Sequence, residues 1–366
     1  MSYIITSESV NCGHPDKVCD LIADSILDAA LRQDSNAHMA VECSIKGNKL
    51  FIYGEALTSA NLDYEKIARG TLKSIGYNGD DFIITQEISA QSCQINDAVI
   101  DRDDMGAGDQ GIMYGYATNE TRECMPVPII MAHRLMKVYD EYRRNKNTNY
   151  KPDAKSQVSI SYNKKNKPIG IKAIVLSVSH DISLNIEQIK MEMIVNVINP
   201  VLAEFTYLDL DTTNIEYIIN PSGAFTIYGP EGDSGCVGRK IVVDTYGGVG
   251  RIGGGCFSSK DPSKVDRSAA YYARYVAKNI VNAGLAERCE IQVAYAIGIA
   301  KPISLHIDCF GTNAFEMESV YKWVNGLFDF SVSNIIKELD LKKPIYRNTA
   351  CYGHFGRDEF PWEGSR

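Results

Sequence analysis

A glycine-rich, cationic stretch of this sequence, residues 232–278, has the residue types of a phosphate-binding site. It contains nine glycines, and from Asp233 to Lys278 it carries eight Lys and Arg against four Asp. Glycine lets backbone N–H groups approach a ligand closely, and successive N–H groups form concavities that bind anions. The cations that surround these glycines are Arg239, Lys240, Lys260 and Lys264. A polyphosphate satisfies both features, whereas a solvated surface loop is the plainer alternative.

The segments that flank the glycines favour the phosphate site over a surface loop. Residues 240–244 (KIVVD) predict a short strand. The residues from Asp261 to Ile280 predict an amphipathic helix that begins with an Asp-Pro-Ser turn. A strand, a glycine loop and a helix N-terminus together form an arrangement that binds phosphates.

Charge and composition narrow the class of ligand. The 366-residue chain has a formal net charge of −8, and because residues 233–278 sum to +4, the remainder sums to −12. Binding a nucleic-acid duplex requires an extended basic surface, so this distribution argues against nucleic acid and favours a small anion. The 45% hydrophobic and 23% charged residues are typical of a globular protein with two or three subdomains.

The cysteine and histidine patterns predict a reduced protein without a zinc centre. Ten cysteines occur without a CxxC pair, and six histidines show no HxH or HxxxH spacing. This pattern argues against a zinc ribbon and a disulfide framework. The first residues show no secretion signal, and no apolar run is long enough to span a bilayer. We therefore expect a cytoplasmic protein with no membrane partner.

Carboxylates in the first thirty residues provide a second candidate site. Asp16, Asp20, Asp24 and Asp28 recur every four residues, which places them in one row on a predicted helix. Such a row is typical of a solvated helix face. Asp16 differs because it lies at the helix start, beside His14 and at a Gly-Pro turn. We therefore predict that Asp16 is a ligand for a divalent cation.

Two glutamates and a glycine motif leave further alternatives open. Glu42 and Glu55 lie inside apolar strands, where they are either charges facing water or ligands. Residues 106–111 (GAGDQG) match G-x-G-x-x-G, but no predicted strand leads into them, and Asp109 would repel a bare pyrophosphate. A carboxylate at this position is consistent with a metal between it and the phosphates. The polar residues 91–111 are typical of either a lid or a disordered connection.

The order of predicted elements indicates an α+β fold built from three related α/β units. Each unit consists of a hairpin and a covering helical segment. In the first unit the predicted hairpin strands are 38–45 and 50–57, and the helix is 62–75. In the second unit the strands are 156–162 and 169–178, and the helix is 185–201. In the third unit the strands are 289–299 and 303–310, and the helices are 316–328 and 332–339. From the residues alone we infer a polyphosphate site that binds a nucleoside triphosphate with Mg²⁺ held by carboxylates from Asp16, Asp109 and Asp233. Because no Ser/His/Asp or Cys/His triad is evident, positioning and charge stabilisation are the expected chemistry.

Five sequence blocks and the C-terminal segment carry a resemblance to a known family. The blocks are Gly13 to Lys17 (GHPDK), Gly106 to Gly111 (GAGDQG), Asp153 to Gln157 (DAKSQ), Gly232-Asp233 with Gly238-Arg239-Lys240, and Gly253 to Arg267 (GGGCFSSKDPSKVDR). In this order, from about Thr6 to Trp362, they resemble the S-adenosylmethionine synthase (methionine adenosyltransferase) family. Residues 344–356 also resemble the C-terminal part of that family.

The resemblance implies three subdomains with pseudo-threefold symmetry: 1–93, 106–220 and 221–366, with a flexible gating loop at 94–105. It implies a transferase of one-carbon metabolism that makes S-adenosylmethionine from ATP and L-methionine. The methionine sulfur attacks C5′ of ATP, and the tripolyphosphate is then hydrolysed to phosphate and pyrophosphate. It also implies two Mg²⁺ per site, K⁺, and a homodimer with shared active sites that pairs into a homotetramer.

The resemblance also assigns residue roles by position. The implied catalytic residues are His14, Lys155, Arg239, Lys260 and Lys264. The implied ATP-binding residues are His14, Asp109, Asp153, Ala154, Lys155, Ala224, Phe225, Asp233, Arg239, Lys240, Cys256 and Lys260. The implied methionine-binding residues are Glu55, Gln91, Asp233 and Lys264, and the implied metal ligands are Asp16 for Mg²⁺ and Glu42 and Asp266 for K⁺. In this scheme His14 acts near the leaving oxygen and Phe225 stacks on adenine.

Four positions depart from the family pattern. Ala224 replaces the usual Arg, Ile252 replaces a common His, and Cys256 and Ser259 alter the GGGAFSGKD block. The departures at 224 and 252 motivate one alternative, a regulatory or scaffold homologue that binds nucleotide and partners without turnover. A second alternative is a different ATP-dependent transferase or kinase. The retained His14 and lysines favour catalysis over binding without turnover. A different transferase would need a base that removes a proton from a substrate hydroxyl, and no such base is evident. Cys256 beside the nucleotide also suggests a thiol-sensitive enzyme.

Overall fold

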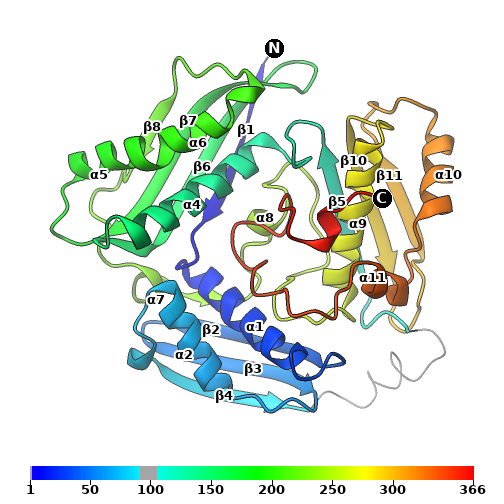
Figure 1. The fold of residues 1–366 in the computed structure, drawn as a ribbon, viewed down its shortest axis with the longest axis horizontal. Helices are drawn as coiled ribbons and strands as arrows, with labels where there is room; N and C mark the ends of the chain where they lie inside the picture. Colours follow the sequence, from blue (N-terminus) through cyan, green and yellow to red (C-terminus); the bar gives the residue numbers. More distant parts are fainter. Residues whose placement is uncertain (1, 91–104) are drawn as a thin grey trace.

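The computed structural model describes residues 2–90 and 105–366, which form three open sheets with helices on one side (Figure 1). The N-terminal sheet contains, in order, β4 (Ile83–Ser89), β3 (Lys49–Leu57), β2 (His38–Lys46) and β9 (Gly235–Cys236). The central sheet contains β1 (Tyr3–Val10), β6 (Tyr150–Tyr162), β7 (Pro168–His180) and β8 (Glu216–Ile219). The C-terminal sheet contains β11 (Ser304–Asp308), β10 (Arg288–Tyr295) and β5 (Gly111–Thr118). The predicted α+β fold of three units is confirmed.

Helices cover one face of each sheet. On the N-terminal sheet lie α1 (Pro15–Leu31) and α2 (Tyr64–Ile75), with the short η1 (Gly79–Asp81). With the central sheet are α4 (Val127–Asn145), α5 (Ile186–Met193), η2 (Ile194–Ile198), α6 (Asn199–Glu204) and η3 (Thr206–Leu208). With the C-terminal sheet are α9 (Val265–Asn282), α10 (Met317–Leu327) and α11 (Val332–Glu338). The short helices α7 (Gly229–Gly232), α8 (Ile241–Asp244) and η4 (Pro361–Glu363) connect these units, and α8 lies near their centre (Figure 1).

The three sheets exchange strands between distant parts of the chain. The first strand, β1, pairs antiparallel with β6 from Tyr3↔Tyr162 to Val10↔Lys155. Strand β5 pairs with β10 in the C-terminal sheet, and the two-residue β9 joins β2 at Ser44↔Cys236. Sequence patterns within each unit do not reveal these pairings, and the contiguous domain boundaries stay a prediction. The exchange joins the three units through backbone hydrogen bonds.

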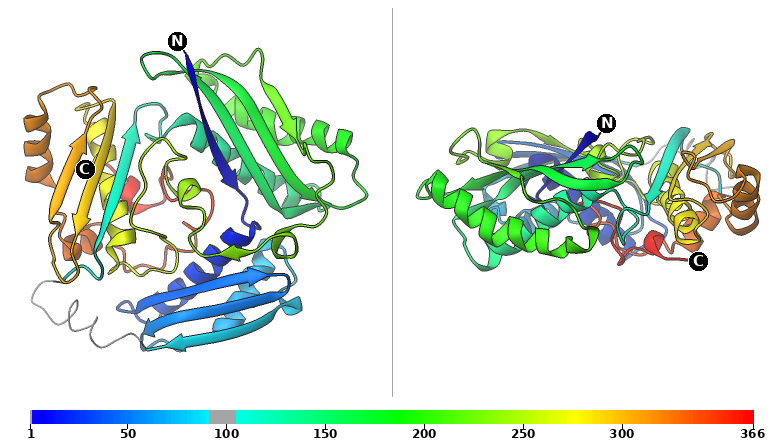
Figure 2. Two further views of the ribbon diagram at one scale, coloured as in Figure 1. Left: turned by 180° about the vertical axis from the view of Figure 1, so that it is seen from behind. Right: turned by 90° about the horizontal axis from the view of Figure 1, so that it is seen from above.

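The sheet faces opposite the helices are uncovered (Figure 2). They carry exposed apolar side chains. Ile4 on β1, Phe51 on β3, Ile83 on β4 and Ile112 on β5 are all exposed. Successive strand residues point to opposite faces, so these side chains alternate with neighbours that pack against the helices. Each of the three sheets therefore presents apolar surface on the same side of the molecule.

Helix α1 is almost entirely buried, and its start is well defined. His14 is the N-cap, Pro15 occupies the first turn, and the Nδ1 atom of His14 accepts a hydrogen bond from the backbone N–H of Asp16. Proline suits this position because its missing N–H would have no partner within the helix. Every residue of α1 except Ala29 is buried. The helix therefore lies between the N-terminal sheet and the loops of the C-terminal third.

The row of four aspartates on α1 is buried, so the prediction of a solvated face is wrong. Each carboxylate accepts backbone N–H groups from segments more than 200 residues further along the chain. The bonds are Cys236 to Asp16 (3.1 Å), Gly238 to Asp20 (2.9 Å), Ser259 to Asp24 (3.1 Å), and Tyr346 and Arg347 to Asp28 (2.9 and 3.0 Å). A buried carboxylate is stable only when such bonds or cations compensate it. These long-range partners explain why the local pattern suggested an exposed face.

Two buried cations complete the network around this row. Lys17, fully buried, donates to Asp20 (2.9 Å) and contacts Asp244 of α8. Arg267 donates two 2.8 Å hydrogen bonds to Asp24, and both side chains have no exposed area. Burial alone would lower the pKa of Arg267, but the Asp24 carboxylate outweighs burial and raises that pKa. The charged groups thus compensate one another inside the protein.

The prediction of a strand at 240–244 is wrong, because residues 241–244 form helix α8. Asp244 N–H bonds to Lys240 C=O at 2.9 Å, and Val243 and Asp244 are buried. A short buried apolar run has the same composition in a helix as in a strand, so periodicity could not separate them. The predicted hairpins and helices of the three repeated units are confirmed, with shifts at their ends.

We predict that Asp24→Asn destabilises the protein strongly. The substitution leaves the buried guanidinium of Arg267 without its countercharge, which costs about 3–5 kcal/mol in comparable buried pairs. Urea unfolding followed by circular dichroism measures the change. As a control, Asp80→Asn removes an exposed pair with Lys73 and should leave the unfolding free energy nearly unchanged. Equal effects of the two substitutions would contradict the structural role of the row.

Candidate active site

The first cluster of candidate site residues is centred on His14. Gly13 donates its N–H to the C=O of Pro152 (3.2 Å), which fixes the turn that carries His14 against β6. The His14 imidazole is 2% exposed. Burial, followed by the nearby Lys240 and Lys155, lowers the pKa of His14 to about 3, although Asp16 and Asp233 oppose the shift. The imidazole is therefore neutral at physiological pH and can donate a hydrogen bond without carrying charge.

Asp16 holds the two cations that follow the glycine-rich turn. Its carboxylate contacts Lys240 Nζ at 2.7 Å and Arg239 Nε at 3.6 Å, and it accepts the Cys236 N–H. Burial raises the pKa of Asp16, but Lys240 and the Cys236 N–H outweigh burial, so that the net pKa is below its ordinary value. Asp16 is thus an ionised carboxylate that already binds positive charge. This chemistry fits the predicted role of a cation ligand.

Asp153 and Lys155 on β6 complete the first cluster together with Asp233. The Oδ2 atom of Asp153 accepts the Gly229 N–H (2.8 Å), whereas its Oδ1 atom is buried and has no hydrogen-bond partner. Burial raises the pKa of Asp153 to about 6. An unsatisfied buried oxygen is costly, so this atom marks a place where a ligand donor or cation would be stabilised. We call His14, Asp16, Asp153, Lys155, Asp233, Arg239 and Lys240 the His14 cluster.

A second cluster, the Lys260 cluster, comprises Glu42, Glu55, Asp109, Cys256, Lys260 and Asp266. Lys260 Nζ contacts the carboxylate of Asp266. Burial raises the pKa of Glu42, with Lys260 opposing and Glu55 reinforcing the shift. Burial also raises the pKa of Asp266, which Lys260 opposes and Asp109 reinforces. The two candidate K⁺ ligands, Glu42 and Asp266, therefore both lie near the ammonium group of Lys260, which supplies positive charge to them.

Lys264 is positioned differently from Lys260. Its ammonium contacts Asp261, which is 1% exposed and also accepts the Met39 N–H at 2.7 Å. Burial raises the pKa of Asp261, but Lys264 and His38 outweigh it and hold the pKa well below its ordinary value. Lys264 thus contributes to the structure of the loop before α9 in addition to any role with a ligand.

The two clusters have different charged partners, although they adjoin where a Cβ on Gly238 would lie 2.1 Å from the Cβ of Cys256. The charged groups that shift the pKa of His14 are all members of the His14 cluster, whereas those acting on Glu42 are Lys260, Glu55 and Asp20. The structure therefore brings the predicted site residues together in two groups. In the described residues, 2–90 and 105–366, no group of three or more His, Cys, Asp or Glu is arranged to hold a metal. A metal here would need further oxygens, such as those of phosphates.

The candidate adenine contact lies in the loop before α7. Phe225 is half-buried, and its backbone makes two hydrogen bonds with His180. The backbone N–H of His180 donates to the C=O of Phe225 (3.0 Å), and the N–H of Phe225 donates to the Nε2 atom of His180 (3.1 Å). The neighbouring Ala224 is exposed. The predicted methionine ligand Gln91 and residues 94–104 of the predicted gating loop lie outside the described residues.

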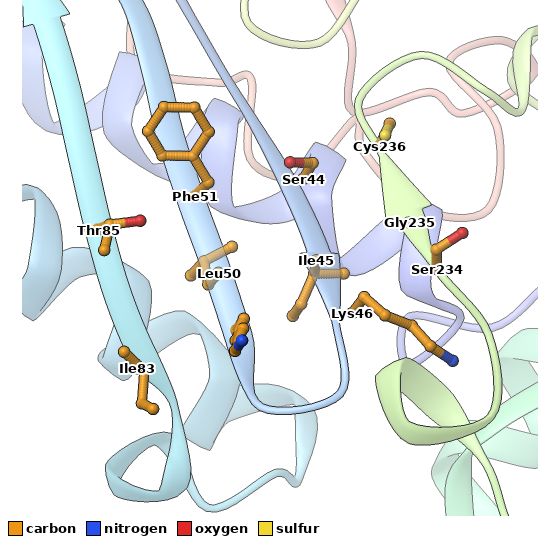
Figure 3. Close-up of a pocket in the computed structure, with 11 residues that line it drawn as sticks. Ser44, Ile45, Lys46, Leu50, Phe51, Ile83, Thr85, Ser234, Gly235 and Cys236 are labelled. Carbon is orange, nitrogen blue, oxygen red and sulfur yellow. The ribbon is translucent and has the colours of Figure 1, made fainter.

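A cavity of about 600 Å³ lies beside the His14 cluster on the uncovered face of the N-terminal sheet (Figure 3). Its lining includes Phe51, Ile83 and Thr85 from β3 and β4, together with Ser234 and, from β9, Cys236. None of the predicted site residues lines it. The cavity is therefore distinct from the candidate active site, although the loop from 233 to 236 borders both.

Two residues that depart from the family pattern have clear local environments. Burial raises the pKa of Cys256 to about 11, with Lys260 opposing and Glu42 reinforcing the shift. Its thiol is therefore protonated at neutral pH, which disfavours the predicted thiol sensitivity because the thiolate is the reactive form. Ser259 has φ +79°, and its buried hydroxyl has no hydrogen-bond partner. A left-handed conformation at a residue with a Cβ is strained.

Sequence reasoning missed several groups that shape the site. Lys17 belongs to the GHPDK block, but its buried pair with Asp244 has no local signal. Tyr77 donates its hydroxyl to the C=O of Gly13 at 2.6 Å, next to His14. Gly76-Tyr77 does carry a signal, since a glycine after a helical pattern predicts a helix end. No local signal indicates that this end lies against residue 13.

Comparison with known proteins gives one consistent result. Three domain models of S-adenosylmethionine synthetase match the chain: the N-terminal domain over residues 2–103, the central domain over 104–225 and the C-terminal domain over 227–364. The chain is also 47% identical over 376 aligned residues to the S-adenosylmethionine synthase of Mesoplasma florum. That alignment covers 99% of this chain and 97% of the relative.

We predict that Ser259→Gly stabilises the protein by about 1 kcal/mol, because glycine tolerates positive φ and removes the unsatisfied hydroxyl. Ser258 provides a matched control. Its buried hydroxyl is also unpartnered, but its φ is not positive. Ser258→Gly should therefore lower stability through the greater chain entropy of glycine. Thermal unfolding of both variants tests the prediction, and a loss of stability in Ser259→Gly would show that the backbone there is not strained.

Proposed function

This chain belongs to the S-adenosylmethionine synthetase family and is thus a methionine adenosyltransferase, and we propose that it makes S-adenosylmethionine in two steps. In the first step the methionine sulfur forms a bond to C5′ of ATP. The C5′–O5′ bond breaks, and tripolyphosphate leaves with its electron pair. In the second step water cleaves tripolyphosphate to phosphate and pyrophosphate. The observation that best supports this proposal is the collection of cations at the glycine-rich loop.

The first step requires no general base, because a thioether has no proton to lose. It requires alignment of sulfur, C5′ and the leaving oxygen, together with stabilisation of a highly charged leaving group. The proposed ligands of the phosphates are Lys155, Arg239, Lys240 and Lys260, with Lys264 near the methionine carboxylate. Acids in the folded protein already hold Lys240 and Lys260 in place. Positive charge is therefore prearranged before the substrate arrives.

His14 is proposed to act at the leaving oxygen. Its imidazole is buried and neutral, and Nδ1 accepts the Asp16 N–H. In the neutral ring the other nitrogen, Nε2, then carries the proton and is available as a donor. A neutral donor can stabilise negative charge that develops on the oxygen without first forming an ion pair with ATP.

The remaining proposed contacts follow from the family resemblance. Phe225 stacks on adenine, with Asp109, Asp153, Ala154, Ala224 and Cys256 around the nucleotide, and Glu55, Gln91 and Asp233 contact methionine. Asp16 would hold Mg²⁺ together with phosphate oxygens, and Glu42 and Asp266 would hold K⁺. Mg²⁺ bound there supplies charge neutralisation for the phosphates. The ionised state of Asp16 and the unpartnered Asp153 oxygen are consistent with cation and ligand binding.

A homodimer is proposed as the active unit, with dimers pairing into tetramers. As the family resemblance implies, the Lys260 cluster of one copy would face the His14 cluster of a second copy across one ATP. The uncovered sheet faces (Figure 2) support this arrangement, because the exposed side chains of Ile4, Phe51, Ile83 and Ile112 would become buried. The two half-sites would then form complete sites at the interface.

The expected cellular location remains a proposal. No helix within residues 2–90 and 105–366 combines the length and apolar character needed to cross a membrane. The nine described cysteines are unpaired, and most are buried. Free cysteines are typical of a reducing compartment, which supports the proposed cytoplasmic location.

The proposed function predicts that ATP and methionine yield S-adenosylmethionine, phosphate and pyrophosphate. Lys260→Ala should lower kcat by about 10²-fold or more, because it removes a cation that stabilises the leaving group. The control Lys343→Ala removes an exposed lysine that also contacts an aspartate, Asp340, and should retain activity. Chromatography of the products tests this directly. Formation of ADP would instead indicate phosphoryl transfer, and no product would indicate a binding protein.

We predict that His14→Asn lowers kcat/KM by about 10²-fold, while asparagine preserves the helix cap. Since the pKa of His14 is about 3, the imidazole stays neutral from about pH 5.5 to 8.5. The ratio of wild-type to variant kcat/KM should therefore be constant over this range. A ratio that grows as the pH falls through about 6.5 would mean that the protonated imidazole acts instead.

A further inference from the structure

Tyr77 joins the end of helix α2 to the turn that carries His14. Gly76 closes α2 in a left-handed conformation, and the N–H of Tyr77 bonds to Leu72 C=O at 3.0 Å. This cap fixes the direction in which the chain leaves the helix. Arg143 of α4 donates to the Ile75 C=O at 2.8 Å, so the central unit also holds the end of α2. Tyr77 is therefore anchored on its main-chain side by two units of the fold.

The Tyr77 hydroxyl holds the residue before His14. It donates a 2.6 Å hydrogen bond to the C=O of Gly13, while the N–H of Gly13 bonds to Pro152. Burial raises the pKa of Tyr77, and Asp153 reinforces the shift. The phenol consequently stays protonated and remains a donor. Both polar groups of Gly13 are thus fixed, which determines where the imidazole of His14 begins.

The same side chain contacts the loop that precedes Asp233. Its ring stacks on Tyr228 with 6.3 Å between centroids and 25° between planes. A Cβ on Gly229 would come within 2.0 Å of the Tyr77 hydroxyl oxygen, so the loop passes directly over it. The Gly229 N–H in turn donates to Asp153 at 2.8 Å. One tyrosine therefore contacts both the His14 turn and the loop leading to Asp233.

We infer that Tyr77 is a positioning residue for the reaction, which sets the placement of the His14 imidazole relative to the nucleotide loop. The inference rests on the proposed role of His14 at the leaving oxygen. Tyr77 is not proposed to touch the reacting atoms. It acts through its hydrogen bond to the Gly13 carbonyl and through its packing on Tyr228. Together these contacts determine the distance between the His14 turn and the segment that leads to Asp233. A small displacement of a catalytic donor lowers the rate much more than it lowers substrate binding.

Tyr77→Phe tests the inference, because it removes the hydroxyl and keeps the ring that stacks on Tyr228. We expect kcat for S-adenosylmethionine formation to fall by about tenfold or more, with KM for ATP changed by less than about twofold. The matched control is Tyr272→Phe, which loses a 2.7 Å hydroxyl hydrogen bond to Glu338 in the C-terminal unit. Both variants should lose a similar few degrees in melting temperature, whereas only Tyr77→Phe should lose kcat.

A double-mutant cycle with His14→Asn separates positioning from a general structural role. If Tyr77 acts through His14, then Tyr77→Phe should cost less than about twofold in a chain that already lacks the imidazole. The same tenfold loss in both backgrounds, or no loss in either, would overturn the inference. The wild-type protein in the same assay distinguishes the two proposals: absence of S-adenosylmethionine there contradicts the proposed function, whereas its formation together with unchanged Tyr77→Phe kinetics contradicts only the role of Tyr77.

Discussion

The row of aspartates along α1 is the interaction on which the rest of this structure depends. A helix advances about 6 Å every four residues, so Asp16, Asp20, Asp24 and Asp28 form evenly spaced acceptors in the interior. Each binds backbone N–H groups from the loops near residues 236–238, 259 and 346–347. Buried carboxylates are costly unless they are satisfied, and these loops satisfy them. The regular spacing of a helix thereby determines the positions of irregular segments.

The candidate site follows from this arrangement because the same loops carry its cations. Asp16 binds both the backbone of Cys236 and the side chain of Lys240, so one carboxylate positions the loop and the charge that it presents. Asp24 bonds to Ser259, directly before Lys260. Cations held at fixed points need little reorganisation when a charged leaving group forms, which is the main requirement of the proposed reaction. Strain at Ser259 accompanies this fixed placement.

Much of the fold and of the site could be predicted from the sequence, and the exceptions share a physical cause. Hairpins and covering helices were evident because periodicity and turn residues are local. The cations of residues 239–264 could be predicted because these lysines and arginines lie close to glycines in the sequence. Pairings such as β1 with β6, and the contact of Tyr77 with Gly13, depend on partners over 60 residues away. For the same reason the aspartate row and residues 240–244 were misassigned, since burial rather than pattern determines their state.

The most direct measurement is a crystal structure of the protein with a nonhydrolysable ATP analogue and methionine. Triphosphate oxygens are expected within hydrogen-bond distance of Lys240 and Arg239 of one copy and of Lys260 of a second copy. His14 is expected beside the oxygen attached to C5′. A triphosphate bound elsewhere, for example in the cavity on the N-terminal sheet, would contradict the claim that the acid-anchored cations stabilise the leaving group.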